Sequence, residues 1–226
     1  MISDIKKSYQ QDFIKINKKF LKIHNSQKYT KDHSKVIDKH LISLWTIIGL
    51  TDKLSLIAVG GYGREELFPS SDIDILILLP NKHGGETKDK VSNFITACWD
   101  LGMKIGHSVR TLKETRFEIH KDIKTTTNLL ESRLIYGATK DFIELNECIK
   151  NEINTDQYYI EKINEQKSRH LKYKETAYQL EPNVKESPGG LRDLHMVLWI
   201  AASQNKGNNF KDLLKNNVID KTEFHK

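Results

Sequence analysis

A glycine pair followed by two aspartates constrains this chain more than any other feature. Gly60 and Gly61 end an apolar run at 54–59, and Asp72 and Asp74 open a second apolar run that continues to Leu79. The second run is typical of a strand buried on both faces. The sequence therefore predicts two strands joined by a glycine-containing connector, with an acidic pair at the head of the second strand.

The acidic pair predicts a metal site. Residues two apart on a strand point to the same face, which places Asp72 and Asp74 roughly 6–7 Å apart. At an effective dielectric of about 20 their charges repel by about 2.5 kcal/mol. Mg²⁺ would offset this repulsion, since it takes oxygen ligands and is usually held by one or two carboxylates plus substrate phosphates. The alternative is an aspartate pair in a solvated turn, which the flanking glycines and apolar run disfavour.

The glycines predict a phosphate contact. Glycine lets the backbone approach a phosphate closely and present N–H groups to it. The connector is not a P-loop, because no Gly-Lys-Ser/Thr follows, and Glu66 breaks the spacing of a dinucleotide fingerprint. A glycine turn beside an Asp-x-Asp pair is instead the layout of a nucleotidyltransferase site.

Three segments resemble the bacterial PII uridylyltransferase (uridylyl-removing) family of the polymerase-β-like nucleotidyltransferase superfamily. The first runs from Gly60 to Leu78, the second combines 101–112 with 125–134, and the third, 180–194, is the most specific to the family. The resemblance extends over about residues 55–202. Members usually continue into an HD hydrolase domain and paired ACT domains, so only the transferase part is matched. Whether the chain is a fragment or a natural short form stays open.

The resemblance implies a fold and an activity. The fold is α+β, with a small mixed sheet and helices as a polymerase-β-like core, N-terminal helices and a C-terminal helical domain. The activity is Mg²⁺-dependent transfer of UMP from UTP to a tyrosine of the PII protein. Two alternatives remain: an adenylyltransferase acting on glutamine synthetase or another protein, and a catalytically impaired regulatory fragment that binds PII or nucleotide.

The candidate site residues follow from the motifs and the resemblance. Arginine binds phosphate bidentately, and four of the arginines, at positions 64, 110, 133 and 192, fall inside the matched segments. An ion pair is the alternative role for Arg64 and for Arg133, which is expected on a helix. The predicted catalytic and metal-binding residues are Asp72 and Asp74, and the predicted nucleotide-binding residues are Gly60, Gly61, Arg64, Ser71, Lys185, Gly189, Gly190 and Arg192.

The third carboxylate of many superfamily members has no counterpart at the expected place. The matching strand, 104–111, contains no Asp or Glu. His107 is a possible general base, because its pKa lies near working pH, although a structural histidine is the alternative. Asp122 and Glu131 are further candidates for the missing acid, and Asp122 is also placed to cap the helix after it.

The expected organisation has three parts: helices in 1–50, a nucleotidyltransferase domain in 51–138 and a helical domain in 139–226. Pro188-Gly189-Gly190 is expected to open a helix, whose N-terminus favours anions. The tail from Asn205 is polar and expected to be mobile. Helices are predicted at 1–24, 30–49, 87–101, 122–136, 156–179 and 191–203, and strands at 54–59, 73–79 and 104–111.

Composition limits the classes of partner that the chain is expected to bind. The net charge of +6 is spread along the chain without a basic block, which argues against a nucleic-acid partner. No segment has the length of a membrane span and the N-terminus lacks an apolar signal region. Cys98 and Cys148 are the only cysteines, and such a distant pair indicates reduced thiols and a cytoplasmic protein. Cys98 is expected in the core.

Overall fold

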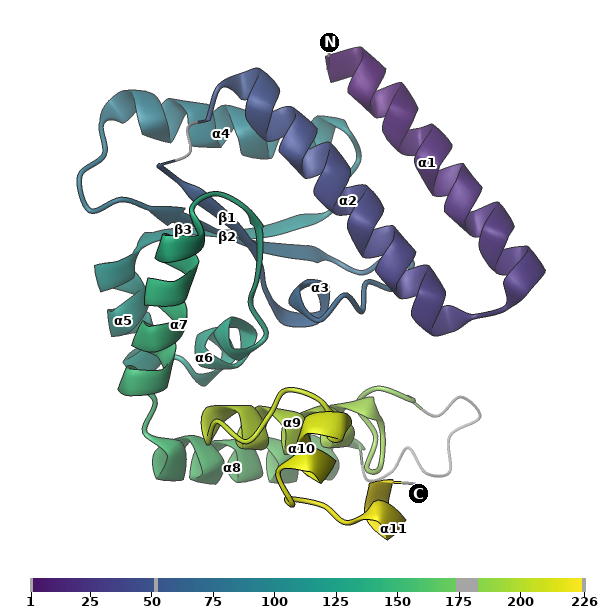
Figure 1. Ribbon diagram of the computed structural model, residues 1–226, viewed down its shortest axis with the longest axis vertical. Coiled ribbons are helices and arrows are strands. Elements are labelled where there is room, and N and C mark those ends of the chain that lie inside the picture. The colour runs from purple at the N-terminus through teal and green to yellow at the C-terminus, as the bar shows by residue number, and fades with distance from the viewer. Residues whose placement is uncertain (1, 51–52, 174–182, 225–226) are drawn as a thin grey trace. The chain divides into compact units, whose positions relative to one another are not determined.

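The computed structural model describes residues 2–50, 53–173 and 183–224. The chain divides into two compact units (Figure 1): one holds Met1–Phe117 and Glu131–Glu147, and the other holds Glu118–Leu130 and Cys148–Lys226. The predicted division at residues 50 and 138 stays a prediction.

The first unit contains a four-stranded mixed sheet in the order β3-β2-β1-β4. β1 pairs antiparallel with β2 and with β4, whereas β2 and β3 run parallel. The predicted α+β fold with a small mixed sheet is confirmed. The strands are β1 (Ser55–Ala58), β2 (Ile73–Leu79), β3 (Ile105–Thr111) and β4 (Arg133–Tyr136).

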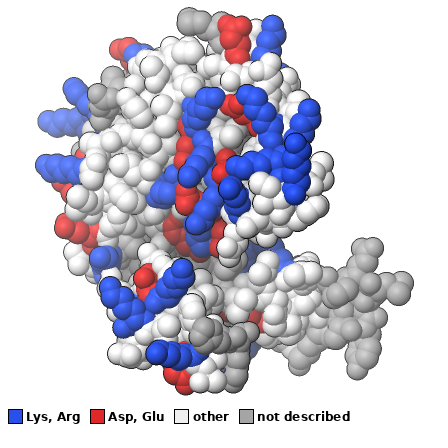
Figure 2. Space-filling model, turned by 45° about the vertical axis from the view of Figure 1, so that its right-hand side comes forward, with Lys and Arg blue, Asp and Glu red and all other residues white. Residues whose placement is uncertain are grey.

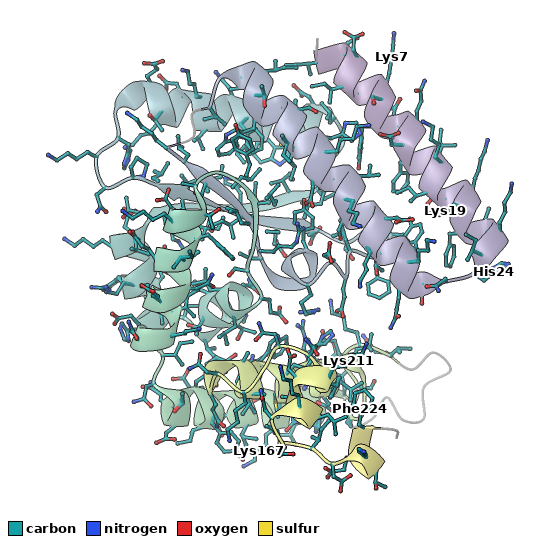
Figure 3. All side chains as sticks on the ribbon, viewed as in Figure 1. Lys7, Lys19, His24, Lys167, Lys211 and Phe224 are labelled. Atoms are coloured by element: carbon teal, nitrogen blue, oxygen red, sulfur yellow. The ribbon has the colours of Figure 1, made fainter. Side chains whose placement is uncertain are left out.

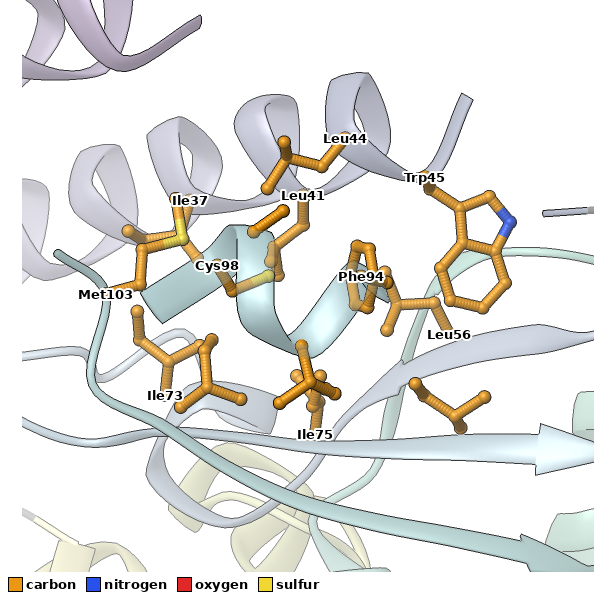
Figure 4. Close-up of a cluster of buried hydrophobic side chains, with 14 of the residues drawn as sticks. Ile37, Leu41, Leu44, Trp45, Leu56, Ile73, Ile75, Phe94, Cys98 and Met103 are labelled. Carbon is orange, nitrogen blue, oxygen red and sulfur yellow. The ribbon is translucent and has the colours of Figure 1, made fainter. Parts of the chain in front are cut away.

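Two helices cover one face of this sheet. α2 (Ser26–Ile48) and α4 (Gly85–Asp100) bury their apolar sides against it (Figure 4). The indole of Trp45 meets the ring of Phe94 edge-on at 5.2 Å, a favoured aromatic geometry. Cys98 lies in this core, fully buried, as predicted. From the sheet, the core receives Leu56, Ala58, Ile73, Ile75, Ile77, Leu79 and Ile105.

The N-terminal helix α1 (Ile2–Ile23) packs along α2 (Figure 1). Asp12 accepts from Lys39 at 2.7 Å, and Lys19, labelled in Figure 3, pairs with Asp32 of α2. The side chain of Asn25 caps α2 by accepting from the Lys28 N–H, so α2 begins earlier than the predicted residue 30. On the face shown in Figure 2, Lys and Arg side chains are interspersed with Asp and Glu.

The helices of the second unit pack around Tyr158, Met196 and Trp199. The Lys162 ammonium lies 4.4 Å from the centre of the Trp199 ring, which stabilises this largely buried charge. This unit contains α6 (Ile123–Leu130), α8 (Thr155–Tyr173), α9 (Leu191–Ser203), α10 (Phe210–Lys215) and α11 (Lys221–Phe224), while α5 (Leu112–Lys121) and α7 (Thr139–Glu152) belong partly to each unit.

Two sequence predictions about elements are wrong. The helix expected at 122–136 ends at Leu130, and Arg133–Tyr136 form β4, because pairing with β1 decides the conformation there. Arg133 is therefore on a strand. The tail beyond Asn205 contains α10 and α11, with Leu213 fully buried. The last part of the helix predicted at 156–179 lies outside the described residues. Nowhere in the described ranges is a helix both long and apolar enough to cross a membrane.

Candidate active site

The glycine turn follows β1 directly. Gly60–Gly63 form the single-turn helix α3, and Gly60 has φ +59°, a left-handed value that favours glycine. Gly63 has a steric reason to be glycine, because a Cβ there would overlap the carbonyl oxygen of Glu131. A Cβ on Gly61 would meet no atom closer than 3.8 Å. Packing therefore requires a glycine at position 63, whereas at position 61 it leaves room for a Cβ.

The two aspartates lie at the start of β2. Asp72 is exposed and immediately precedes the strand, while Asp74 is half-buried on it. Asp74 alternates with Ile73 and Ile75, whose side chains enter the core under α2 and α4, so its carboxylate points to the opposite face. Val59, the residue before the glycine turn, donates its N–H to the Asp74 carbonyl at 3.0 Å. The turn and the aspartates thus lie at one end of the β1–β2 pair.

Gly106 makes room for the Asp74 carboxylate. It is the register partner of Asp74 on β3, and a Cβ at this position would overlap Asp74 Oδ1. Gly106 was not among the residues predicted from the sequence. Its place beside Asp74 follows only from the parallel register of β2 and β3.

Arg64 and Ser71 lie in the loop between the turn and β2. Arg64 pairs with Glu66 at 2.9 Å and with Glu131. Burial alone would lower the pKa of Arg64, but these two carboxylates raise it above its usual value, so the guanidinium stays charged. The ion-pair role for Arg64 is what the structure shows. Ser71 is half-buried and donates its N–H to the Phe68 carbonyl.

A partly buried ionic network anchors the turn. The Asp38 carboxylate of α2 accepts from Arg133 Nη1 at 2.8 Å, from Arg133 Nη2 at 3.1 Å and from the Tyr62 hydroxyl at 2.5 Å. Burial, with the neighbouring Asp38 charge, raises the pKa of Tyr62 well above its usual value. Asp38 was not predicted from the sequence because its partners lie 24 and 95 residues away. Arg133 is an ion-pair residue here.

His107 is not brought together with the aspartates. It is the register partner of Ile75 and therefore lies on the face that α2 and α4 cover. Its ring meets Trp99 of α4 edge-on at 6.1 Å. On the Asp74 face, β3 presents Gly106, Ser108 and Arg110 instead. The third-acid candidates have structural roles: Glu131 pairs with Arg64, and Asp122 caps α6 through the N–H groups of Lys124 and Thr125.

The remaining predicted residues belong to the second unit, in the turn before α9. Gly189 has φ +78°, and a Cβ on Gly190 would lie 2.6 Å from the Val184 carbonyl oxygen. Lys185 is exposed, and Arg192 pairs with Glu186 at 3.3 Å. The predicted contact of these residues with a nucleotide held by Asp72 and Asp74 stays a prediction.

Asp193 holds this second turn in place. Its carboxylate accepts from Gly189 N–H at 2.7 Å, Arg169 Nη2 at 2.6 Å, Gln166 Nε2 at 3.0 Å and His170 Nε2 at 3.0 Å. Burial would raise the pKa of Asp193, but these hydrogen bonds outweigh it and hold the pKa well below its usual range.

The donor set at β2 suits Mg²⁺. Across the described ranges no group of three or more His, Cys, Asp or Glu side chains could hold a metal ion by itself. Asp72 and Asp74 are a pair of carboxylates, the number that protein Mg²⁺ sites use when substrate phosphates complete the shell.

Comparisons with known proteins agree with this geometry. Residues 37–188 match the model of the nucleotidyltransferase domain, and residues 157–226 match that of the GlnD PII-uridylyltransferase. The bifunctional uridylyltransferase/uridylyl-removing enzyme of Chromobacterium violaceum is 44% identical over 86% of this chain and 23% of its own length. The enzyme of the same name from Haemophilus influenzae is 41% identical over 92% of this chain and 25% of its own. The chain therefore spans about a quarter of the curated relatives it matches, and the resemblance drawn from the motifs is confirmed.

Proposed function

The chain belongs to the nucleotidyltransferase domain family, and from this premise we propose that it transfers UMP from UTP to a tyrosine of a PII-type regulatory protein. One observation carries the proposal. The half-buried Asp74 and the exposed Asp72 start β2 beside a glycine turn, and Gly106 leaves space at Asp74 Oδ1. The names of the relatives support uridylyl transfer as the specific reaction.

In this proposal Asp72 and Asp74 hold Mg²⁺, which when bound would neutralise phosphate charge and align the attacking and leaving oxygens. The space in front of Gly61 would admit the triphosphate close to the backbone. Lys185 and Arg192 would add charge to the phosphates through their side chains, since the nearby Gly189 N–H is already bonded to Asp193.

The chemistry is a substitution at phosphorus. The tyrosine oxygen attacks the α-phosphorus, the bond to the β-phosphate oxygen breaks, and pyrophosphate leaves. On the Asp74 face, β3 carries neither a carboxylate nor an imidazole, so the phenol proton passes to solvent. The site's contribution is then positioning and charge stabilisation, with no general base from β3.

The test is the intact mass of a purified PII protein after incubation with this chain, Mg²⁺ and either UTP or ATP. A gain of one UMP with UTP alone is expected. A gain of AMP with ATP instead would support the adenylyltransferase alternative, with glutamine synthetase as the next acceptor to test. A folded chain that binds UTP but adds nothing would contradict catalysis by this chain and favour a regulatory role.

A further inference from the structure

A hollow lies on the sheet face opposite to Asp74. Its volume is about 470 Å³, within the usual range for small-molecule pockets. It lies beside α4 and the edge strand β3. His107 and Val109 of β3 are exposed and line it.

One wall is a stripe along α4. Lys88, Ser92, Thr96 and Trp99 recur every three or four residues, so they share one helix face, and all four line the hollow. The Trp99 side chain is 54% exposed. Its indole and the His107 ring, 6.1 Å apart and inclined by 64°, give the hollow an aromatic surface that a planar group can stack on.

Lys88 supplies the positive charge at the hollow and Glu114 the negative charge. The Glu114 carboxylate accepts from the Thr111 N–H at 2.7 Å and from the Thr111 hydroxyl at 2.9 Å, and these bonds lower the pKa of Glu114. This carboxylate therefore already accepts hydrogen bonds from Thr111, at the start of α5. Lys88 makes no ion pair with any residue in the described ranges, whereas the neighbouring Lys90 pairs with Glu86 at 2.8 Å.

We propose that this hollow is a second binding site, separate from the aspartates, for a small planar ligand that carries one anionic group. The planar part stacks on Trp99 and contacts Val109, and the anionic group pairs with Lys88. The site also gives His107 a role, as part of the aromatic surface. Because His107 and Gly106 are consecutive on β3, the ligand would lie across the strand from Asp74.

Two matched probes test the proposal. Anilinonaphthalene sulfonate has a planar naphthalene ring and an anionic sulfonate, and phenylnaphthylamine is the same ring system without the sulfonate. The chain has three tryptophans, of which Trp45 and Trp199 are buried. In ¹⁵N-labelled protein the indole N–H signal that disappears in Trp99→Phe identifies Trp99. Titration with the anionic probe should shift this signal and leave the Trp45 signal in place.

Charge recognition is tested with Lys88→Gln and its control Lys90→Gln. Lys88→Gln should weaken the affinity for the anionic probe on the order of threefold, as expected for one exposed charge pair. It should leave the affinity for the neutral probe unchanged. Lys90→Gln should change neither affinity. The proposal is overturned if the anionic probe saturates without shifting the Trp99 signal, or if the two lysine variants behave alike. Circular dichroism of each variant confirms that it is folded.

Discussion

The glycine turns at 60–63 and 188–190 differ in what requires their glycines. In the turn before α9, Gly189 has a positive φ, Gly190 packs against backbone carbonyls, and the Gly189 N–H is bonded to Asp193. The fold accounts for every part of that turn. In the turn after β1, packing and backbone conformation account for Gly60 and Gly63 but not for Gly61.

The proposed function gives a reason for this difference. In the proposal, Gly61 is a glycine because the nucleotide, and not the packing of the chain, needs the space beside the two carboxylates. By the same reasoning, the second turn can contact a nucleotide only through side chains such as Lys185.

The largest expected effect is at the carboxylates of the first turn. Asp74→Asn keeps the shape but removes the charge, so transfer of UMP should fall by on the order of 100-fold or more, as for other lost charge-stabilising groups. The rate is measured by the mass of the modified PII protein. Asp89→Asn, an exposed aspartate on α4, is the control and should keep full activity. Equal rates in the two variants would remove Asp74 from the site.

The next largest effect is a difference in stability between variants of Gly63 and Gly61. Gly63→Ala forces a Cβ into the Glu131 carbonyl and should lower the free energy of unfolding by about 2–3 kcal/mol. Gly61→Ala adds a Cβ that makes only ordinary contacts, 3.8 Å from Arg64 Nη2 and from the Glu66 carbonyl oxygen. It should leave the free energy of unfolding unchanged or raise it by up to about 1 kcal/mol. Urea unfolding measures both. Equal destabilisation would mean that packing also requires Gly61.

The second turn should respond to acid through Asp193. Its pKa is depressed in the folded state, so its contribution is fully present above the unfolded value of about 4 and is lost as pH falls below it. Asp193→Asn should cost about 2 kcal/mol at pH 6, as expected for hydrogen bonds to a charged group. The difference in the free energy of unfolding between wild type and variant, measured by urea unfolding, should become smaller between pH 4 and pH 3. A difference that does not depend on pH would contradict the ionic role of Asp193.

The smallest effect concerns the side chains of the second turn. Lys185→Gln should raise the KM for UTP by about threefold, in keeping with an exposed charge contact, and leave stability unchanged. Lys211→Gln, an exposed lysine of α10 in the same unit (Figure 3), is the matched control. If both variants keep the KM of the wild type, the second turn does not contact the nucleotide.

Local patterns predicted the first three strands, the acidic pair and the Leu191–Ser203 helix, because each depends on neighbours in the sequence. β4 was missed because its four residues become a strand only by pairing with β1. The same limit applies to the anchoring network, since Asp38 meets Arg133 across 95 residues. His107 lay on the predicted strand, but its face follows from register with β2 rather than from composition.

The most direct test of the central claim is the affinity of Gly61→Ala for UTP in the presence of Mg²⁺, measured by isothermal titration calorimetry beside the wild type. The account predicts at least about a tenfold weaker affinity, as expected when a well-packed contact worth 1.4 kcal/mol is lost, in a variant whose unfolding is unchanged. Unchanged affinity in a folded variant would contradict the claim that the space in front of Gly61 receives the nucleotide.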